Sequence, residues 1–427
     1  MSVSSQAARA SAPASSHLYR IIAAGSIGNA LEWYDLLLYG YFAVTLSNVF
    51  FPKGNETVSL LATFGTFGVS YLVRPLGAIV LGAYGDRAGR KASLMVSILL
   101  MVIGTLMMAL MPSYAAIGVL APIGVLVARL IQGFSVGGEF GSATSFLVEH
   151  GPDRKGFLAS WQWSGQGLAA LLASAFGVVL TTALAPADLQ SWGWRIPFVF
   201  GLLIGPVGFY IRRNVDETPE FNQLETAAAP LRDVVVGQWG KVLLAIGAVV
   251  LSTSSNYVIL YMPTFAIKQL GLPQSSGFVA TLIGAAILTI GAPMIGHWSD
   301  KVGRIRVMVA ATLLFMISAY PVFLMLTAQQ SLAALVAVVA WMSLLKTGYS
   351  GALPALLAEI FPTRTRVTGM ALSYNIGVPL FGGFAPLTVQ WLIGVTGSKL
   401  APSYYLIGAG LLSLIALFAI RRRLRIS

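Results

Sequence analysis

Long apolar stretches without a single charge are the feature of this sequence that most restricts its fold. No charged residue occurs from Ala92 to Ala128 or from Val307 to Leu345. A helix needs about 20 apolar residues to cross the hydrocarbon core of a bilayer, so each stretch is long enough for two spans. Only 10% of the chain is charged, whereas a soluble domain carries roughly 25%. The sequence therefore predicts an all-α integral membrane protein.

Breaks at Pro, Gly and charged clusters divide the apolar sequence into twelve expected transmembrane helices. The two longest stretches break at the turn-like segments 111–114 and 328–331. The expected helices lie near residues 18–47, 58–84, 92–111, 115–147, 157–184, 194–212, 241–267, 276–298, 305–327, 331–359, 367–396 and 401–421. Because this number is even, both chain ends are expected on the same side of the membrane.

The distribution of basic residues orients this layout. Of the 27 Lys and Arg residues, Lys53, Arg195, Lys268 and Lys399 fall on one side of the membrane. The others outside the spans fall at the termini and in the opposite loops, as in the Arg421–Arg423 tail. Because positive charge gathers on the cytoplasmic side, we expect a multi-pass protein of the bacterial inner membrane with both termini in the cytoplasm. The same bias accounts for the net charge of +12, so we expect no nucleic-acid partner.

The composition argues against several classes of enzyme. There is no cysteine, and His17, His150 and His297 are scattered without metal-ligand spacing. No Gly-Lys-Ser/Thr phosphate loop is present, which argues against ATP as the energy source. We expect no metal, no cofactor and no enzymatic activity. An integral membrane enzyme stays as a remote alternative.

Two short motifs each occur twice, about half a chain apart. Gly82–Lys91 reads Gly-Ala-Tyr-Gly-Asp-Arg-Ala-Gly-Arg-Lys, and Gly296–Arg304 reads Gly-His-Trp-Ser-Asp-Lys-Val-Gly-Arg. A Glu-x-x-Pro-x-Arg motif likewise occurs at 149–154 and at 359–364. Matched spacings in two motifs indicate duplicated halves, which is a known transporter plan.

The repeat predicts a division of the chain and a set of gates. The expected parts are a cytoplasmic tail 1–17, a six-helix bundle 18–213, a cytoplasmic linker 214–240, a six-helix bundle 241–421 and a cytoplasmic tail 422–427. The repeated loops are expected to act as cytoplasmic latches that close when the transporter opens outward. Their gating residues are Gly82, Asp86, Arg87, Gly89, Arg90, Glu149, Arg154, Asp300, Arg304, Glu359 and Arg364.

Three further motifs complete a resemblance to a known family. They are Gly28–Asp35 (Gly-Asn-Ala-Leu-Glu-Trp-Tyr-Asp), Arg129–Glu139 (Arg-Leu-Ile-Gln-Gly-Phe-Ser-Val-Gly-Gly-Glu) and Trp192–Phe198 (Trp-Gly-Trp-Arg-Ile-Pro-Phe). Together with the Gly82–Lys91 loop, they resemble the metabolite:proton symporter family of the major facilitator superfamily. The resemblance implies two pseudo-symmetric six-helix bundles and proton-driven uptake of a small metabolite. That family is similar to citrate, α-ketoglutarate, shikimate and proline/betaine carriers.

Six ionisable residues fall inside the expected spans, where a charge is costly unless it is paired or faces water. They are Glu32, Asp35, Arg74, Arg129, Glu139 and Lys346. From a helical rise of about 1.5 Å per residue, Asp35 and Arg129 are both expected near mid-membrane. Burial and a neighbouring guanidinium act in opposite directions on the protonation of a carboxyl group. We therefore expect an Asp35–Arg129 ion pair that switches with protonation, as the resemblance also implies, with Glu32 and Glu139 assisting. A static salt bridge is the alternative.

Lys346 is the one ionisable residue inside the expected spans of the second half. We expect it to clamp a di- or tricarboxylate together with Arg129, across a central cavity. The alternative is a lysine paired with a helix dipole or with an unidentified acid. Residues at similar depth complete the expected substrate site: Tyr34, Gln132, Gln162, Asn256, Tyr257, Tyr374 and Asn375.

These features together predict a secondary active transporter that works by alternating access. The expected reaction is proton-coupled uptake of a small organic acid such as citrate or α-ketoglutarate, by a monomer in the lipid bilayer. Two other substrate classes stay open: zwitterionic osmolytes such as proline or betaine, and aromatic acids such as shikimate. A zwitterion needs a single cation site, so Lys346 would be surplus for an osmolyte carrier.

Overall fold

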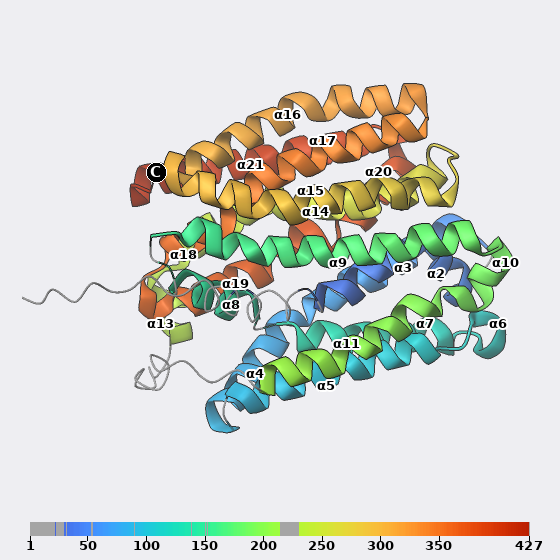
Figure 1. Cartoon of the computed structure of the whole chain (residues 1–427), viewed down its shortest axis with the longest axis horizontal. Coiled ribbons are helices and arrows are strands. Elements are labelled where there is room, and N and C mark those ends of the chain that lie inside the picture. Colours follow the sequence, from blue (N-terminus) through green and yellow to red (C-terminus); the bar gives the residue numbers. More distant parts are fainter. Residues whose placement is uncertain are drawn as a thin grey trace, which may run out of the picture.

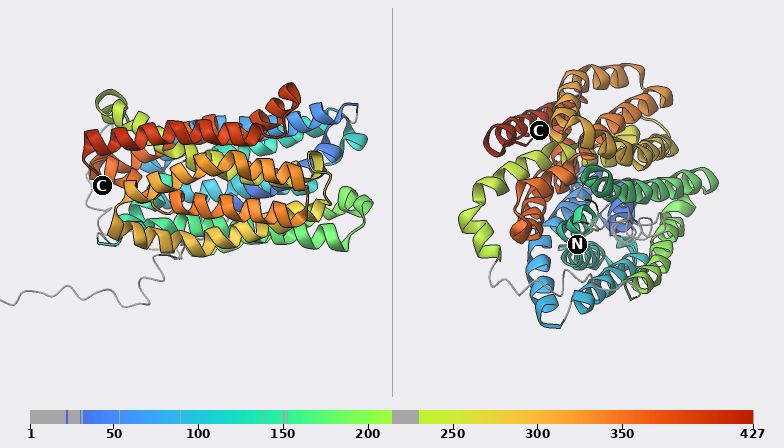
Figure 2. Two further views of the ribbon diagram at one scale, coloured as in Figure 1. Left: turned by 90° about the horizontal axis from the view of Figure 1, so that it is seen from above. Right: turned by 60° about the vertical axis from the view of Figure 1, so that its left-hand side comes forward.

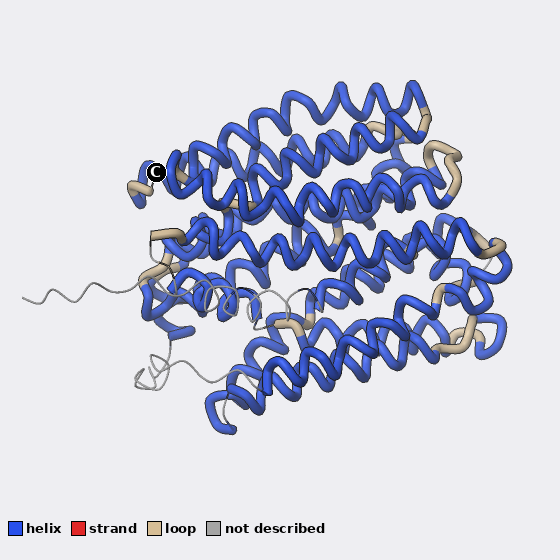
Figure 3. Tube along the Cα trace, viewed as in Figure 1, coloured by secondary structure: helices blue, strands red, loops and turns tan. Residues whose placement is uncertain are grey.

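The computed structural model describes residues 22, 30, 32–52, 54–88, 90–137, 139–149, 151, 153–213 and 230–426. Over these residues the fold is helical and contains no β-strand (Figure 3). Nine helices in this part of the chain are long and apolar enough to cross a membrane: Glu56–Leu81, Leu120–Glu149, Lys155–Ala183, Trp239–Lys268, Gln274–Val302, Arg304–Gln329, Leu332–Ile360, Thr363–Thr396 and Ala401–Leu424. Further helical segments over residues 32–50, Arg90–Leu110 and Arg195–Arg213 complete the expected twelve passes.

The N-terminal bundle consists of a first helix over residues 32–41 and the elements that follow it up to residue 213. These elements are α2 (Ala43–Phe50), α3 (Glu56–Leu72), α4 (Arg74–Ala88), α5 (Arg90–Leu110), α6 (Tyr114–Ile117), α7 (Leu120–Ser135), α8 (Glu139–Glu149), α9 (Lys155–Ala183), α10 (Pro186–Asp188), the π-helical turn η1 (Leu189–Gly193) and α11 (Arg195–Arg213). Figure 1 shows them in blue to light green along one side of the molecule.

The C-terminal bundle follows a short helix, α13 (Pro230–Gly237), that lies in the expected linker. Its elements are α14 (Trp239–Lys268), α15 (Gln274–Val302), α16 (Arg304–Gln329), α17 (Leu332–Ser350), α18 (Leu353–Ile360), the 3₁₀ turn η2 (Thr363–Thr365), α19 (Arg366–Val378), the π-helical turn η3 (Pro379–Gly383), α20 (Ala385–Thr396) and α21 (Ala401–Leu424). The last helix runs three residues into the expected tail 422–427.

Besides the first expected helix, which is interrupted at Phe42, four expected helices are each broken. Pro75, Pro354 and Pro379 lie at or next to three of the breaks, where proline removes a backbone donor and clashes with the preceding turn. The fourth break follows α7, at Val136 and Gly137. A Cβ atom on Gly137 would lie 2.5 Å from the backbone nitrogen of Ala78, so the absence of a side chain there lets α4 approach closely.

Large apolar side chains cover the outside of the bundles. Leu110, Ile290 and Ile317 are among those that are mostly exposed. Water-soluble monomers rarely expose so much contiguous apolar surface, whereas the acyl chains of a bilayer accommodate it. Helical pairing of the backbone polar groups meets the other requirement of a lipid environment.

The two halves meet along α9 and α15, which form the most extensive contact between elements of the fold. The right view of Figure 2 shows the two halves side by side, and the left view shows the helices running along the long axis of the molecule. The Ser164 hydroxyl on α9 donates to the backbone oxygen of Thr289 on α15, at 2.7 Å. A Cβ atom on Gly167 would lie 2.7 Å from the backbone nitrogen of Thr289. Glycine at this position therefore allows the two backbones to touch.

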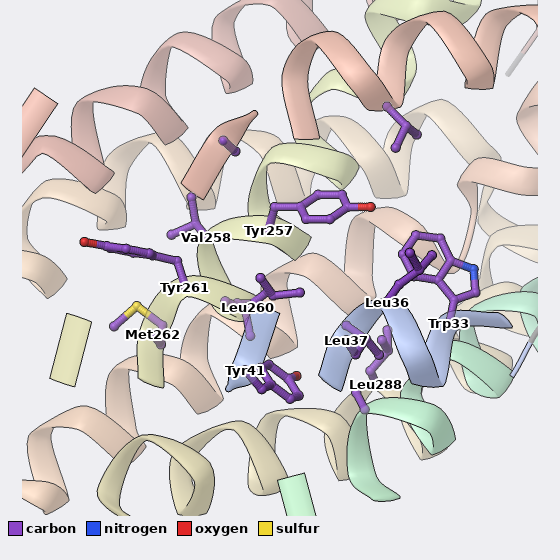
Figure 4. Close-up of a cluster of buried hydrophobic side chains, with 14 of the residues drawn as sticks. Trp33, Leu36, Leu37, Tyr41, Tyr257, Val258, Leu260, Tyr261, Met262 and Leu288 are labelled. Carbon is purple, nitrogen blue, oxygen red and sulfur yellow. The ribbon is translucent and has the colours of Figure 1, made fainter. Parts of the chain in front are cut away.

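The first helix and α14 form a second contact between the halves. Figure 4 shows Trp33, Leu36, Leu37 and Tyr41 lying close to the side chains of residues 257–262. These side chains are buried and belong to one apolar cluster that extends through both halves. Most of α14 is enclosed by neighbouring helices, and 83% of the residues in its apolar central stretch are buried. The centre of the molecule is thus built from elements of both halves.

Candidate functional site

Asp35 belongs to a buried chain of polar side chains inside the N-terminal bundle. Its carboxylate accepts a hydrogen bond from the Thr105 hydroxyl on α5. The Gln132 amide on α7 donates to that hydroxyl at 3.1 Å, and Arg129 donates to the Gln132 carbonyl oxygen at 2.8 Å. Asp35 and Arg129 are 4% and 0% exposed. The predicted acid and base are therefore coupled through Thr105 and Gln132.

This arrangement corrects the expected direct ion pair. Among the described side chains, Asp35 and Arg129 form no ion pair with each other. The Arg129 guanidinium instead lies 4.5 Å from the centre of the Tyr39 ring and 5.5 Å from that of Phe67. An aromatic face attracts a cation, and the two rings hold Arg129 on the Gln132 side of the chain. Two guanidinium nitrogens and one Asp35 oxygen have no hydrogen-bond partner in the described part of the protein.

The other expected members of this site lie elsewhere. Tyr34 donates to the backbone oxygen of Pro197 at 3.0 Å, and its ring packs on Phe176 and Phe200. It therefore faces α11 and not the substrate path, because the hydroxyl finds its partner on that helix. Glu32 is buried in the first helix. Glu139 begins α8, but its side chain lies outside the described ones.

Lys346 lies at the boundary between the two halves. The side chain is 4% exposed and donates a hydrogen bond to the amide oxygen of Asn256 on α14. Its ammonium group is 5.5 Å from the centre of the Trp163 ring, which belongs to α9 of the other half. No acidic residue among those described pairs with it. The contacts therefore leave the charge of Lys346 without a counter-ion in this part of the protein.

A small cavity opens next to Lys346, with a volume of about 20 Å³. Residues of the first helix, α9, α14, α15 and α17 line it: Leu37, Tyr41, Gln166, Ala170, Asn256, Ile259, Thr281, Gly284, Ala285, Leu288, Ser343 and Lys346. This volume corresponds to about one water molecule. The cavity lies between the halves, and both contribute to its lining.

The lining includes some of the expected substrate residues and lacks others. Asn256 and Lys346 face the cavity, whereas Arg129 is not among the lining residues. The predicted Lys346–Arg129 clamp is therefore not formed in this structure, because Tyr39 and Phe67 cover Arg129.

Three other expected substrate residues also lie outside the cavity lining. The Tyr257 hydroxyl donates to that of Tyr71 at 2.6 Å. The ring of Tyr374 stacks on Phe140 at 3.8 Å, and the Asn375 amide donates to the backbone oxygen of Gly137 at 2.6 Å. These contacts join the two halves, so the three residues close the interface in this state.

Two residues at the centre were not predicted. Gln166 lines the cavity one helical turn after Gln162, and both side chains are buried. The spacing of four residues, which places both on one face of a helix, was the signal that could have identified it. Thr105 had no such signal, because it is a single hydroxyl within an apolar stretch.

Arg74 is also central, although the prediction gave it no role. Its guanidinium lies 3.9 Å from the ring centre of Tyr71 and 5.8 Å from that of Trp33, and it is 1% exposed. Tyr71 contacts Tyr257 of the other half. Arg74 therefore supports an aromatic contact between the two bundles.

The second repeated loop closes one end of the molecule, named here the basic end. The carboxylate of Asp300 accepts hydrogen bonds from the backbone N–H groups of Gly156 and Phe157, at 2.8 and 3.0 Å. These groups open α9, so Asp300 caps a helix of the other half and faces the positive end of its dipole. Arg304 binds Asp300 at 2.7 Å and Glu359 at 3.2 Å.

Two other residues with expected gating roles also occur at the basic end. Glu149 pairs with Arg366 across the halves, at 3.3 Å. Arg364 pairs with Asp233 on α13, at 3.5 Å, and both are largely exposed. Arg154 is exposed just before α9. The expected first-loop gates Gly82, Asp86, Arg87, Gly89 and Arg90 lie outside the described side chains.

Contacts at the opposite end, named here the far end, close the molecule there as well. Lys268 at the end of α14 pairs with Glu56 at the start of α3. Gln274 donates to the hydroxyl of Thr45 at 2.9 Å. With both ends joined and a cavity between the halves that contains the buried Lys346, the fold and site define a membrane transporter of the alternating-access class.

Comparison with known sequences identifies the family. Residues 21–234 match the Sugar (and other) transporter family, and residues 274–425 match the Major Facilitator Superfamily. Citrate-proton symporters of Klebsiella pneumoniae and Salmonella typhi are 40% and 37% identical, over 93% and 91% of this chain and 90% and 91% of those proteins. A proline/betaine transporter of Escherichia coli (strain K12) is 33% identical over 93% of this chain and 82% of that protein.

Solved structures show the same fold. The proton:xylose symporter XylE superposes with a TM-score of 0.77 at 17% identity, and the match covers 96% of both chains. A partially occluded inward-open form of XylE from E. coli has a TM-score of 0.74 at 18% identity, over 96% of this chain and 98% of XylE. The chain belongs to the major facilitator superfamily of membrane transporters, and the predicted fold class is confirmed.

Proposed function

We propose that this protein is a proton-coupled symporter that takes up a small di- or tricarboxylate, with citrate as the leading candidate. Lys346 carries this proposal, because its buried positive charge lines the central cavity beside the neutral partner Asn256. A buried charge is costly when it has no partner of opposite sign. A carboxylate in the cavity supplies that partner. The 40% identity to a citrate-proton symporter supports the same substrate class.

Asp35 is the proposed proton carrier. It is buried, it has one carboxylate oxygen without a partner among the described residues, and it is coupled to Arg129 through Thr105 and Gln132. Protonation of Asp35 removes the negative charge at one end of this chain and so changes the balance of charge at Arg129. Glu32 and Glu139 remain proposed helpers in proton transfer.

Arg129 is a proposed substrate ligand of the open states. Movement of Tyr39 and Phe67 away from the guanidinium would let Arg129 and Lys346 hold two carboxylates of one substrate. The cavity of about 20 Å³ is much smaller than citrate, so the substrate-bound site must be wider than this closed one. The residues proposed to border the wider site are Gln132, Gln162, Asn256, Tyr257, Tyr374 and Asn375. Tyr34 is left out of this site, because its hydroxyl is bonded to α11.

The basic end is proposed to face the cytoplasm of a bacterial cell, with the protein acting as a monomer in the inner membrane. The excess of Lys and Arg at this end supports that orientation. The contacts at this end would then hold the cytoplasmic side closed and break as it opens. They are the Asp300 cap of α9, the ion pairs of Arg304 with Asp300 and Glu359, and the Glu149–Arg366 pair. The division into a bundle 18–213, a linker 214–240 and a bundle 241–421, with cytoplasmic tails 1–17 and 422–427, is part of this proposal.

An osmolyte carrier is the second candidate, because a proline/betaine transporter is 33% identical over most of the chain. Lys346 argues against it. A trimethylammonium group would meet a like charge in the cavity, and the ring of Trp163 that would attract it already faces the lysine. Shikimate, a cyclic acid, also carries a carboxylate and is compatible with Lys346.

Uptake into proteoliposomes tests the proposal. The purified protein is reconstituted and offered labelled citrate, α-ketoglutarate, shikimate, proline or glycine betaine, with and without a pH gradient that is acidic outside. We expect a di- or tricarboxylate to accumulate above its external concentration, and only when the gradient is present. Accumulation of betaine alone, or uptake that ignores the gradient, would refute the proposal.

A further inference from the structure

Gln166 is a buried amide that the symport mechanism above leaves without a role. The side chain is 2% exposed and lines the same cavity as Lys346. Neither its amide nitrogen nor its amide oxygen has a hydrogen-bond partner among the described residues. A buried amide that lacks partners is costly, and most such groups in proteins are satisfied. An amide with both ends free next to a cavity thus indicates a ligand group that it binds.

The position of Gln166 on α9 is held on both sides. Two residues before it, the Ser164 hydroxyl is bonded to the backbone oxygen of Thr289 on α15. One residue after it, Gly167 allows the backbone of α15 to approach so closely that a Cβ atom would lie 2.7 Å from the Thr289 nitrogen. The helix backbone is therefore pinned against the other half, and Gln166 has a defined position at the cavity wall.

The chemistry of the amide limits which group it binds. Its nitrogen only donates hydrogen bonds and its oxygen only accepts them, whereas a hydroxyl does both. A carboxylate would satisfy the nitrogen and repel the oxygen, and a trimethylammonium group would offer no N–H or O–H donor. Among these groups of a substrate, a hydroxyl is the one that can satisfy both ends of Gln166, in place of water.

From this geometry we infer that Gln166 binds a hydroxyl group of the substrate whose carboxylate is held by Lys346, so that the substrate is a hydroxycarboxylate. The inference rests on the proposed function, since it assumes that Lys346 binds a carboxylate. Both side chains line the same cavity, so one small substrate can present a carboxylate to Lys346 and a hydroxyl to Gln166. A site built to pair a substrate hydroxyl rejects the analogue that lacks it, because its own buried groups are then left unpaired.

Pairs of acids that differ by this hydroxyl test the inference. Citrate is compared with tricarballylate, and malate with succinate, as competitors of labelled substrate in proteoliposomes of the wild type, Gln166→Leu and Gln390→Leu. Gln390 is the matched control, since it is also buried but accepts a hydrogen bond from Tyr261 away from the cavity lining. We expect the wild type and Gln390→Leu to prefer the hydroxy acid by about tenfold, one hydrogen bond in a buried site. Gln166→Leu should lose that preference through weaker binding of the hydroxy acid alone.

The outcomes separate the inference from the function on which it rests. If the wild type binds carboxylates but does not distinguish the two members of either pair, the role of Gln166 is wrong and the symport proposal stands. The same holds if Gln166→Leu keeps the wild-type preference. If the wild type binds no carboxylate at all, the proposed function is wrong and the inference falls with it. An equal loss of affinity for both members in Gln166→Leu would also overturn it, since it indicates a purely structural amide.

Discussion

The two halves of this transporter handle buried charge in different ways. In the N-terminal half, Asp35 and Arg129 have opposite charges and are connected within one bundle by Thr105 and Gln132. In the C-terminal half, Lys346 contacts the neutral amide of Asn256 and faces the cavity between the halves. The polar chain of the first half thus contains an acid and a base, whereas the cavity contact of the second half contains a base and no acid.

This difference suggests a division of labour. A closed polar chain that contains an acid can change its charge by one proton without any other partner, which suits a coupling site. A lone buried cation is completed by an anion from outside the chain, which suits a substrate site. The halves share repeated loops and a common fold, so the difference arises from a few side chains inside the membrane.

Asp35→Asn tests the coupling side of the comparison and has the largest expected effect. The variant cannot exchange a proton at this position, so uphill accumulation driven by a pH gradient should be abolished. Exchange of labelled for unlabelled substrate should persist, because it needs no net proton movement. Both are measured in proteoliposomes, with Asp153→Asn as the control, since Asp153 is exposed. Undiminished uphill uptake by Asp35→Asn would place proton coupling elsewhere.

Lys346→Gln tests the substrate side. Loss of a charged hydrogen bond to a carboxylate costs about 1.5–3 kcal/mol, so apparent affinity should fall by about 10- to 100-fold. The measurement is the concentration dependence of exchange, with Lys268→Gln as the control at a partly exposed lysine of the far end, outside the cavity lining. If affinity for every organic acid stays at the wild-type value, Lys346 does not contact the substrate.

Asp300→Ala tests whether the basic end works as a latch. The change removes the cap of α9 and the partner of Arg304. A helix cap is worth about 1 kcal/mol, so the population open at the basic end should rise about fivefold. The chain has no cysteine, so Ser160→Cys introduces a single thiol at a buried position near Gly296.

The rate of alkylation of that thiol is the measurement. It should increase in Asp300→Ala and stay unchanged in Asp233→Ala, which breaks only the exposed pair with Arg364. Equal alkylation rates in the wild type and Asp300→Ala would show that the latch does not control opening.

Glu56→Gln has the smallest expected effect. It breaks the ion pair with Lys268 at the far end, where Glu56 is largely exposed. Exposed ion pairs contribute about 0–1 kcal/mol, so transport rates should change by no more than about fivefold. An effect as large as that of Lys346→Gln would mean that the far end, and not the central site, controls substrate entry.

The sequence alone predicted the spans and the duplication, because both depend on local composition. Apolar stretches such as Val307 to Leu345 are long enough to require two crossings, and α16 and the span Leu332–Ile360 (α17 with α18) lie within a few residues of their expected positions. Asp300 was expected to belong to a latch, and in the structure it caps α9 of the other half and pairs with Arg304. Such contacts follow from a repeated motif whose place in the topology is known.

The composition of the site depended on tertiary packing. In a bilayer both the lipid-facing and the inward-facing sides of a helix are apolar, so the sequence carries little information on which way a helix is rotated. The depth of a residue in the membrane was therefore predictable, but the direction in which its side chain points was not. Tyr34 faces α11, Arg129 lies against Tyr39 and Phe67, and Gln166 faces the cavity. The sequence determined that this protein crosses the membrane in two related halves with charges near mid-depth. Only the packing of those halves decided which charges are joined and which one faces the cavity.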